Sequence, residues 1–155
     1  MQKRVLFLSS ANGARSQMAE AFLRTLAGDR FEAHSAGSEP RGVDPLTVVV
    51  MAERGIDVRE QRAQGLHEYM GKVDFDFLIT VCDRDEKACP VFPGKGAREY
   101  WPVGDPASVE GSPEARLAAF RETRDHIEAR VRRWLVERRY KPAPQPSLES
   151  VGTGR

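Results

Sequence analysis

The sequence predicts a small α/β domain with a doubly wound, four-stranded parallel sheet and helices on both faces. Short apolar runs alternate along the chain with segments whose apolar residues recur at helical spacing. Strands that alternate with helices are typical of a parallel sheet. The length of 155 residues fits one domain with a sizeable core, and we place that domain at residues 1–140.

The first elements surround a loop of small residues. Arg4–Leu8 is a short, mostly apolar run, which predicts a buried strand. Apolar residues at helical spacing predict a helix over Arg15–Leu26. Phe31–Ser35 predicts a second strand, which we expect to end at Ala36-Gly37.

The middle of the chain continues this alternation. Asp44 followed by Pro45 is typical of an N-cap and a first helical position, and Gly55 is typical of the end of that helix. Phe75–Val81 predicts a third strand, apolar enough to be central, and Tyr100–Val103 predicts a short fourth strand.

A long helix is expected to open at Ser112-Pro113, because apolar residues then recur at helical spacing as far as Leu135. After Tyr140 the chain holds three prolines, two glycines and little apolar content. We therefore predict a disordered tail over residues 141–155.

Composition excludes several classes of function. The net charge of +1 gives no electrostatic case for nucleic acid or a membrane surface, and no apolar run approaches the length of a membrane span. The expected compartment is the cytoplasm. The two cysteines, Cys82 and Cys89, are too few for a secreted disulfide scaffold, and no histidine stands at a zinc spacing from them.

The loop after the first strand is suited to a tetrahedral oxyanion. Backbone N–H groups of such a loop point at one place, and the dipole of the following helix favours negative charge there. Arg15 adds a planar fork that can hold two oxygens. The expected oxyanion-binding residues are Ser10, Ala11, Asn12, Gly13, Ala14, Arg15 and Ser16. Ligands of doubly wound sheets bind beyond the carboxyl ends of strands, where both this loop and Cys82 fall.

The pattern Ser9-x5-Arg15-Ser16 resembles the phosphate loop of the low-molecular-weight tyrosine phosphatase superfamily, which reads Cys-x5-Arg-Ser. The stretch Val5–Glu20 is most similar to one branch, the thioredoxin-coupled arsenate reductases. Further matching segments follow in order: Ser35-Ala36-Gly37, Gly55-Ile56-Asp57, Ile79-Thr80-Val81-Cys82-Asp83, Cys89-Pro90-Val91-Phe92-Pro93-Gly94, Trp101-Pro102 and Asp105-Pro106. The resemblance covers residues 4–136 and implies a low-molecular-weight phosphatase-like fold.

The resemblance also implies catalytic roles. Ser9 stands at the position of the nucleophilic cysteine, Arg15 would stabilise charge on the oxyanion, and Asp105 would act as general acid. Asn12 and Ser16 would shape the loop. A serine hydroxyl is barely ionised at neutral pH, and none of the histidines lies in a matched segment. We therefore expect oxyanion binding with very slow turnover, whether Ser9 is an engineered replacement or natural.

The cysteine pair distinguishes between the branches. The resemblance implies a relay in which Cys82 attacks the nucleophilic cysteine, Cys89 attacks Cys82, and thioredoxin reduces the resulting disulfide. Phosphatases do not need this pair, and where they place an aromatic residue after Asp-Pro this chain has Ala107. A redox switch without arsenate chemistry, or two ordinary thiols, remain the other interpretations of the pair.

These residues predict an arsenate reductase impaired at Ser9, with arsenate or phosphate as ligand and thioredoxin as reductant. The alternatives are a low-molecular-weight protein tyrosine phosphatase and a non-catalytic oxyanion-binding relative. No cofactor is expected. Members of the family can carry potassium, and Asn12, Glu20 and Ser35 match contributing positions. Gln64 replaces a further acidic ligand, so no metal ion is expected.

Overall fold

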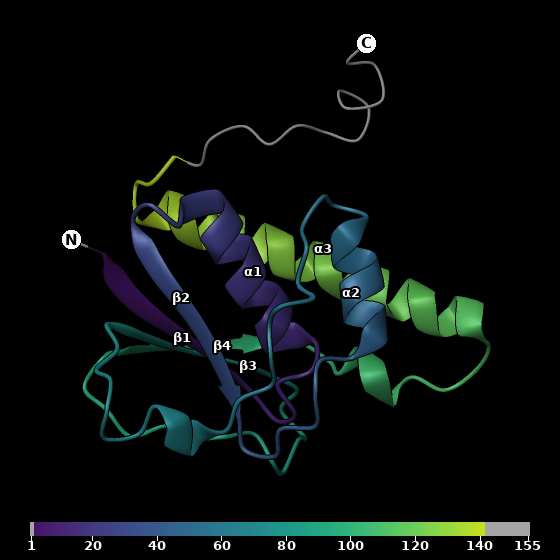
Figure 1. Cartoon of the computed structure of the whole chain (residues 1–155), viewed down its shortest axis with the longest axis horizontal. Helices are drawn as coiled ribbons and strands as arrows, with labels where there is room; N and C mark the ends of the chain where they lie inside the picture. The colour runs from purple at the N-terminus through teal and green to yellow at the C-terminus, as the bar shows by residue number, and fades with distance from the viewer. Residues whose placement is uncertain (1, 142–155) are drawn as a thin grey trace.

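The structure, a computed structural model, describes residues 2–141 and contains a four-stranded, all-parallel sheet (Figure 1). The strands are β1 (Lys3–Ser9), β2 (Phe31–Gly37), β3 (Phe77–Cys82) and β4 (Ala97–Pro102), in the order β2-β1-β3-β4. This confirms the predicted fold class. Apart from Lys141, the tail predicted over residues 141–155 lies outside the described residues.

The helices are α1 (Arg15–Ala27), α2 (Pro45–Ala52) and α3 (Pro113–Glu137), with short 3-10 helices η1 (Leu66–Glu68) and η2 (Pro106–Ser108). Asp44 caps α2 as expected, because its side chain accepts the Leu46 N–H at 2.9 Å. Ser112 caps α3 in the same way, accepting the Ala115 N–H at 3.1 Å.

Two strand boundaries differ from the prediction. β3 begins at Phe77 rather than Phe75, because Phe75 packs in a cluster on the sheet face opposite the α-helices. β4 covers Ala97–Pro102 rather than Tyr100–Val103. Its first two residues, Ala97 and Arg98, are exposed because β4 is an edge strand, so buried apolar residues mark only its end.

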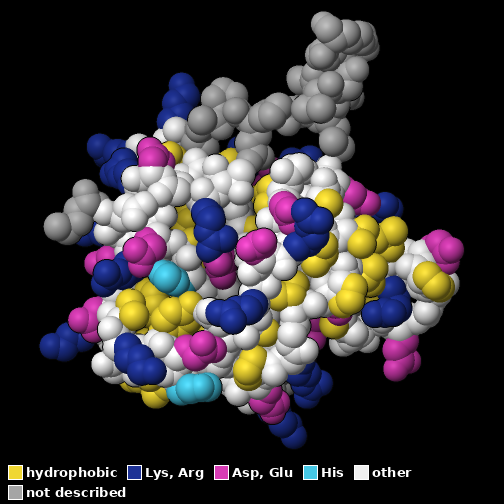
Figure 2. Space-filling model, viewed as in Figure 1, with side chains coloured by type: hydrophobic (Ala, Val, Ile, Leu, Met, Phe, Trp, Pro, Cys, Tyr) yellow, Lys and Arg dark blue, Asp and Glu magenta, His cyan; other side chains and the backbone are white. Residues whose placement is uncertain are grey.

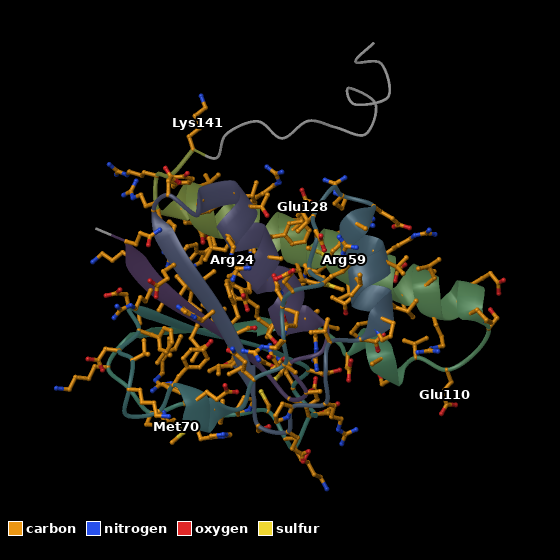
Figure 3. The ribbon with its side chains drawn as sticks, in the orientation of Figure 1. Arg24, Arg59, Met70, Glu110, Glu128 and Lys141 are labelled. Carbon is orange, nitrogen blue, oxygen red and sulfur yellow. The ribbon has the colours of Figure 1, made fainter. Side chains whose placement is uncertain are left out.

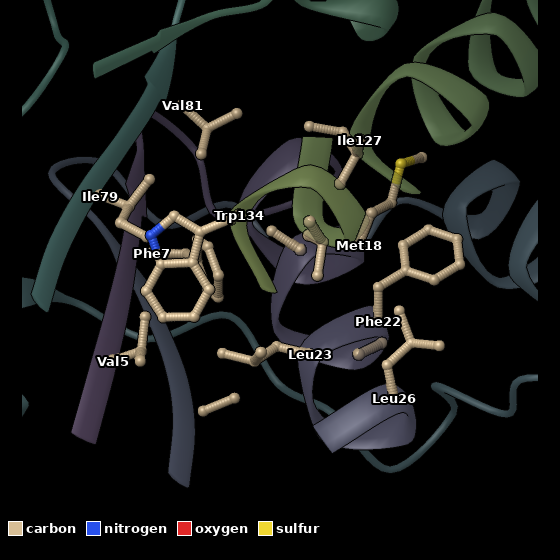
Figure 4. Close-up of a cluster of buried hydrophobic side chains, with 14 of the residues drawn as sticks. Val5, Phe7, Met18, Phe22, Leu23, Leu26, Ile79, Val81, Ile127 and Trp134 are labelled. Carbon is tan, nitrogen blue, oxygen red and sulfur yellow. The ribbon is translucent and has the colours of Figure 1, made fainter. Parts of the chain in front are cut away.

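The two faces of the sheet are covered unequally. Alternate residues of β1 point to opposite sides, so that Phe7 joins the larger core cluster and Leu8 the smaller. All three α-helices cover the first face, and Figure 4 shows Trp134 and Met18 packed there. The second face carries the 3-10 helix η1 and loops. This thinner layer comes from the part of the β2–β3 connection that follows α2 and from the β3–β4 connection.

The winding direction reverses at β1, which lies between β2 and β3. Ligands of such sheets bind beyond the carboxyl ends of the strands at this reversal. Lys and Arg side chains are interspersed with Asp and Glu on the face shown in Figure 2, without one basic patch. None of the helices within residues 2–141 is long and apolar enough to cross a membrane.

Candidate active site

The β1–α1 loop is held in shape from two sides. Asn12 adopts a left-handed backbone with φ of 52°, and its Oδ1 accepts the Gln64 N–H at 2.8 Å and Gln17 Nε2 at 2.9 Å. Gly37, at the end of β2, lies against the other side. A Cβ on Gly37 would lie 2.6 Å from the Ser10 carbonyl oxygen and 2.9 Å from the Asn12 nitrogen. The close approach of β2 to the loop therefore requires glycine at this position.

Ser9 occupies the first position of this loop and is 2% exposed. Its Oγ lies 2.5 Å from Ser16 Oγ. Because Ser16 Oγ also accepts Asn12 Nδ2 at 2.7 Å, the Ser16 hydroxyl hydrogen is free to be donated to Ser9. No carboxylate or imidazole in the described part of the chain hydrogen-bonds to Ser9. This surrounding stabilises negative charge at the position but supplies no base for a serine.

The N-terminus of α1 faces the loop without a side-chain cap. Its N-cap residue is Ala14, whose side chain cannot accept a hydrogen bond from the helix N-terminus, and the first turn contains no acidic residue. In contrast, α2 and α3 both have capping side chains. The uncapped N–H groups and the positive end of the α1 dipole are therefore available to an anion.

Arg15 is the charged group of the site and is 3% exposed. Its guanidinium donates to the Val103 carbonyl at 2.9 Å, binds both carboxylate oxygens of Glu86, and lies 3.9 Å from Asp105. Burial alone would lower the pKa of Arg15, but the hydrogen bond and charge of Glu86 raise it above the ordinary arginine value. A buried, permanently charged fork thus lies beside Ser9's loop.

Sequence reasoning missed Glu86. It lies between the two cysteines in the chain, and Ser10 Oγ donates to it at 2.5 Å. Burial raises the pKa of Glu86, but the hydrogen bonds from Arg15, Ser10 and the Asp83 N–H outweigh this effect and lower the pKa to about 2. Glu86 is therefore ionised at neutral pH. The sequence feature that could have identified Glu86 is its position shortly after the end of β3, because the carboxyl end of β3 lies beside that of β1 and its loop.

Asp105 reaches the site from the segment after β4. One of its oxygens accepts the Ala107 N–H at 2.9 Å, which caps η2, and the other lies near Arg15. The side chain is 35% exposed. A carboxyl group that is fixed by its backbone and open to solvent can exchange a proton with a ligand of the loop.

These groups border one cavity of about 450 Å³. Its lining residues include Ser9, Ala11, Asn12, Gly13, Ala14, Arg15 and Asp105. A larger cavity of about 640 Å³ lies elsewhere, around Phe75 and Gly94, and contains none of these groups. We therefore take the smaller cavity as the candidate site, because only there do loop, arginine and carboxyl group meet.

Comparison with known proteins agrees with this geometry. Residues 4–143 match the family described as low molecular weight phosphotyrosine protein phosphatase. The chain belongs to this family. It is 38% identical to an arsenate reductase of Shouchella clausii over 86% of this chain and 96% of that protein. It is 39% identical to an arsenate reductase of Halalkalibacterium halodurans over 85% of this chain and 95% of that protein.

Solved structures show the same relationship. An arsenate reductase in the phosphate binding state superimposes with a TM-score of 0.70 at 28% identity, covering 88% of this chain and 98% of that one. A thioredoxin-dependent arsenate reductase of Corynebacterium glutamicum has a TM-score of 0.64 at 26% identity, covering 88% of this chain and 61% of that one. Within the phosphatase family, this chain is thus similar to arsenate reductases.

Two thiols lie near each other at the end of β3 in this phosphatase-family chain. Cys82 is buried and Cys89 is half-buried, and both are free. Burial and then the hydrogen bond with Cys89 raise the pKa of the Cys82 thiol, whereas the charge of Arg15 acts in the opposite direction. Cys82 therefore lies close enough to Arg15 for the two groups to interact electrostatically.

The residues at the family's potassium positions are already bonded to protein groups. Glu20 accepts Ser35 Oγ at 2.6 Å and pairs with Arg24, which is labelled in Figure 3. Arg24 also donates to the Ala33 carbonyl at 3.3 Å, and the Gln64 side chain accepts a hydrogen bond from Tyr69. Because a guanidinium lies against the acidic group that a cation would need, these residues do not fit potassium.

Proposed function

We propose that this chain is an arsenate reductase of the low-molecular-weight phosphatase family whose loop binds arsenate or phosphate and whose turnover is impaired by Ser9. The observation that carries the proposal is that Cys82, at the end of β3, lies near both Cys89 and Arg15. A phosphatase has no use for a thiol pair at this place. The proposal is also supported by relatives named arsenate reductase, which match nearly their whole length.

The residues would act as follows with a cysteine in place of Ser9. Its thiolate attacks arsenic while Arg15 holds the equatorial oxygens, and Asp105 protonates the oxygen that leaves as water. Cys82 then attacks the sulfur bonded to arsenic. A disulfide forms, the electron pair of the sulfur–arsenic bond leaves with arsenic, and As(V) becomes As(III). Cys89 attacks Cys82 and frees the first sulfur.

The Cys82–Cys89 disulfide would then be reduced by the dithiol of thioredoxin, which restores both thiols. This step is supported by the thioredoxin-dependent arsenate reductase among the similar structures. Free thiols of this kind persist in a reducing compartment, so we place the reaction in the cytoplasm.

Ser9 favours a second candidate, an oxyanion-binding relative without catalysis. Ser9 has no sulfur, so a sulfur–arsenic bond cannot form at this position. Its hydroxyl contacts Ser16, which is no base, so no oxygen nucleophile is activated either. In this second reading Cys82 and Cys89 still form a disulfide with each other. Ser9→Cys separates the two candidates because it restores only the missing sulfur.

The test is arsenate reduction by Ser9→Cys with thioredoxin, thioredoxin reductase and NADPH, followed as NADPH oxidation. We expect Ser9→Cys to turn over at least ~10³-fold faster than the parent, in line with the cost of losing a nucleophile. Adding Cys82→Ser or Cys89→Ser should abolish turnover. Ser10→Cys, which places a thiol one position along the loop, is the matched control and should stay inactive.

Each other outcome favours a different function. Hydrolysis of p-nitrophenyl phosphate by Ser9→Cys without arsenate reduction would identify a tyrosine phosphatase, against the direction that Ala107 indicates. Phosphate binding with neither activity would identify the binding relative. Absence of any oxyanion binding would contradict all of these functions.

A further inference from the structure

Glu86 connects the anion loop to the thiol pair. It lies in the segment of residues 83–88, which joins Cys82 to Cys89. Its carboxylate nevertheless reaches the β1–α1 loop, where Arg15 donates to both oxygens and Ser10 Oγ donates at 2.5 Å. The remaining contact, from the Asp83 N–H at 2.7 Å, fixes the carboxylate to its own segment.

These contacts are the ones that an oxyanion needs. A guanidinium binds a carboxylate and a phosphate-like oxyanion through the same planar fork. Arg15 already carries Glu86 on its two terminal nitrogens and has Asp105 near it. A doubly charged oxyanion bound to Arg15 in the adjoining cavity would lie beside both carboxylates, and like charges so close together repel each other.

Little else anchors the segment to the rest of the molecule. Asp83, Arg84, Asp85 and Lys87 are exposed. Among the described residues, one side-chain hydrogen bond besides those of Glu86 holds residues 83–88 to the rest of the molecule. Ser38 Oγ donates it to the Ala88 carbonyl. A segment with few buried contacts opens readily once its main anchor is lost.

We propose that Glu86 is the resident anion of the oxyanion site, which an incoming oxyanion expels from Arg15, and that its departure releases the 83–88 segment. The proposal rests on the proposed function in taking an oxyanion as the ligand of the loop. Glu86 thereby sets the affinity of the loop and allows Cys82 and Cys89 to move only after the oxyanion has bound. Because such coupling is reciprocal, weakening the Glu86 contact must strengthen oxyanion binding.

The test measures phosphate binding by calorimetry on the unmodified chain, Glu86→Gln and Asp85→Asn. Glu86→Gln removes the resident charge and should bind phosphate at least about tenfold more tightly, as expected when a charged hydrogen-bonded competitor is lost. Asp85→Asn makes the same change in net charge within the same segment but touches no arginine, and its affinity should stay within about twofold of the parent.

Hydrogen exchange on the unmodified chain supplies a second readout that needs no variant to fold. Saturating phosphate should protect the β1–α1 loop and, against the usual effect of a ligand, accelerate exchange of the amides of residues 83–88. In Glu86→Gln these amides should already exchange fast without phosphate.

Two results would overturn the proposal. One is phosphate affinity in Glu86→Gln that equals or falls below that of the unmodified chain, including no detectable binding by either. The other is unchanged or slower exchange of residues 83–88 when the unmodified chain is saturated. Neither readout depends on turnover. The proposal about Glu86 can therefore fail even if Ser9→Cys reduces arsenate, and it can hold even if Ser9→Cys does not.

Discussion

Cys82 and Cys89 are seven positions apart in the chain, yet they differ in their surroundings. Cys82 ends the central strand β3 and is fully buried, whereas Cys89 is half-buried in the loop that follows. Burial disfavours the thiolate and raises the pKa of Cys82, with the Cys89 contact adding to the effect. Since the thiolate is the reactive form, the two thiols should differ in reactivity although they lie near each other.

We therefore predict that iodoacetamide modifies Cys89 well before Cys82 at pH 8 and low temperature, by at least about tenfold in rate. Peptide mapping by mass spectrometry measures both sites in one sample. The control is Cys89→Ser, in which little label should be incorporated until the chain is unfolded in urea. Equal labelling of the two thiols in the folded chain would show that Cys82 is accessible and would contradict the burial described here.

At the scale of elements, the carboxyl end of β2 supports the anion loop. Gly37 pairs with Ser9 in the parallel register, and its backbone lies directly against the loop. A methyl group at this position would lie 2.6 Å from the Ser10 carbonyl oxygen, well inside van der Waals contact. The neighbour is backbone, which cannot rotate away, so either the loop or the end of β2 must shift.

Gly37→Ala should therefore weaken phosphate binding by about tenfold or more and destabilise the fold by roughly 1–3 kcal/mol. Calorimetric titration gives the first quantity and urea unfolding the second. Gly104→Ala is the matched control, because a Cβ there would meet only Asp83 Oδ2 at 3.8 Å, and it should change both quantities little. An unchanged phosphate affinity in Gly37→Ala would show that the loop still binds phosphate when a Cβ on β2 displaces its backbone.

Which elements could be predicted depends on how each element is buried. β1 contains a continuous apolar run, and α1 and α3 carry apolar residues at helical spacing. The Asp44-Pro45 cap is a local signal, so all of these were predictable. β4 lies at the edge with exposed polar residues, and its start left no hydrophobic pattern. Glu86 was missed for another reason, because its role comes from a contact 71 residues away in the chain.

At the scale of the whole molecule, stability is linked to the functional site through charge. Glu53, Asp57 and Glu86 have a lowered pKa because arginines bind them, and that of Glu86 falls from an ordinary value of 4.5 to about 2. A carboxylate whose pKa is lower in the folded state stabilises the fold above its unfolded pKa, and this contribution is lost as pH falls toward the folded value. For Glu86 that window runs from about pH 4.5 to about pH 2.

Glu86→Gln should therefore unfold more easily than the parent at pH 6, and this difference should shrink by about 1–2 kcal/mol between pH 5 and pH 3, allowing for solvent screening of the half-buried pair. Urea titrations at pH 6, 5, 4 and 3 without phosphate provide the measurement. Asp85→Asn, which forms no ion pair among residues 2–141, controls for the change in net charge. If the difference in the free energy of unfolding between the parent and Glu86→Gln stayed constant down to pH 3, the Arg15 contact would contribute packing but no net charge stabilisation. The carboxylate would then be held by its segment alone, and the same result would predict that phosphate has nothing to gain from expelling it.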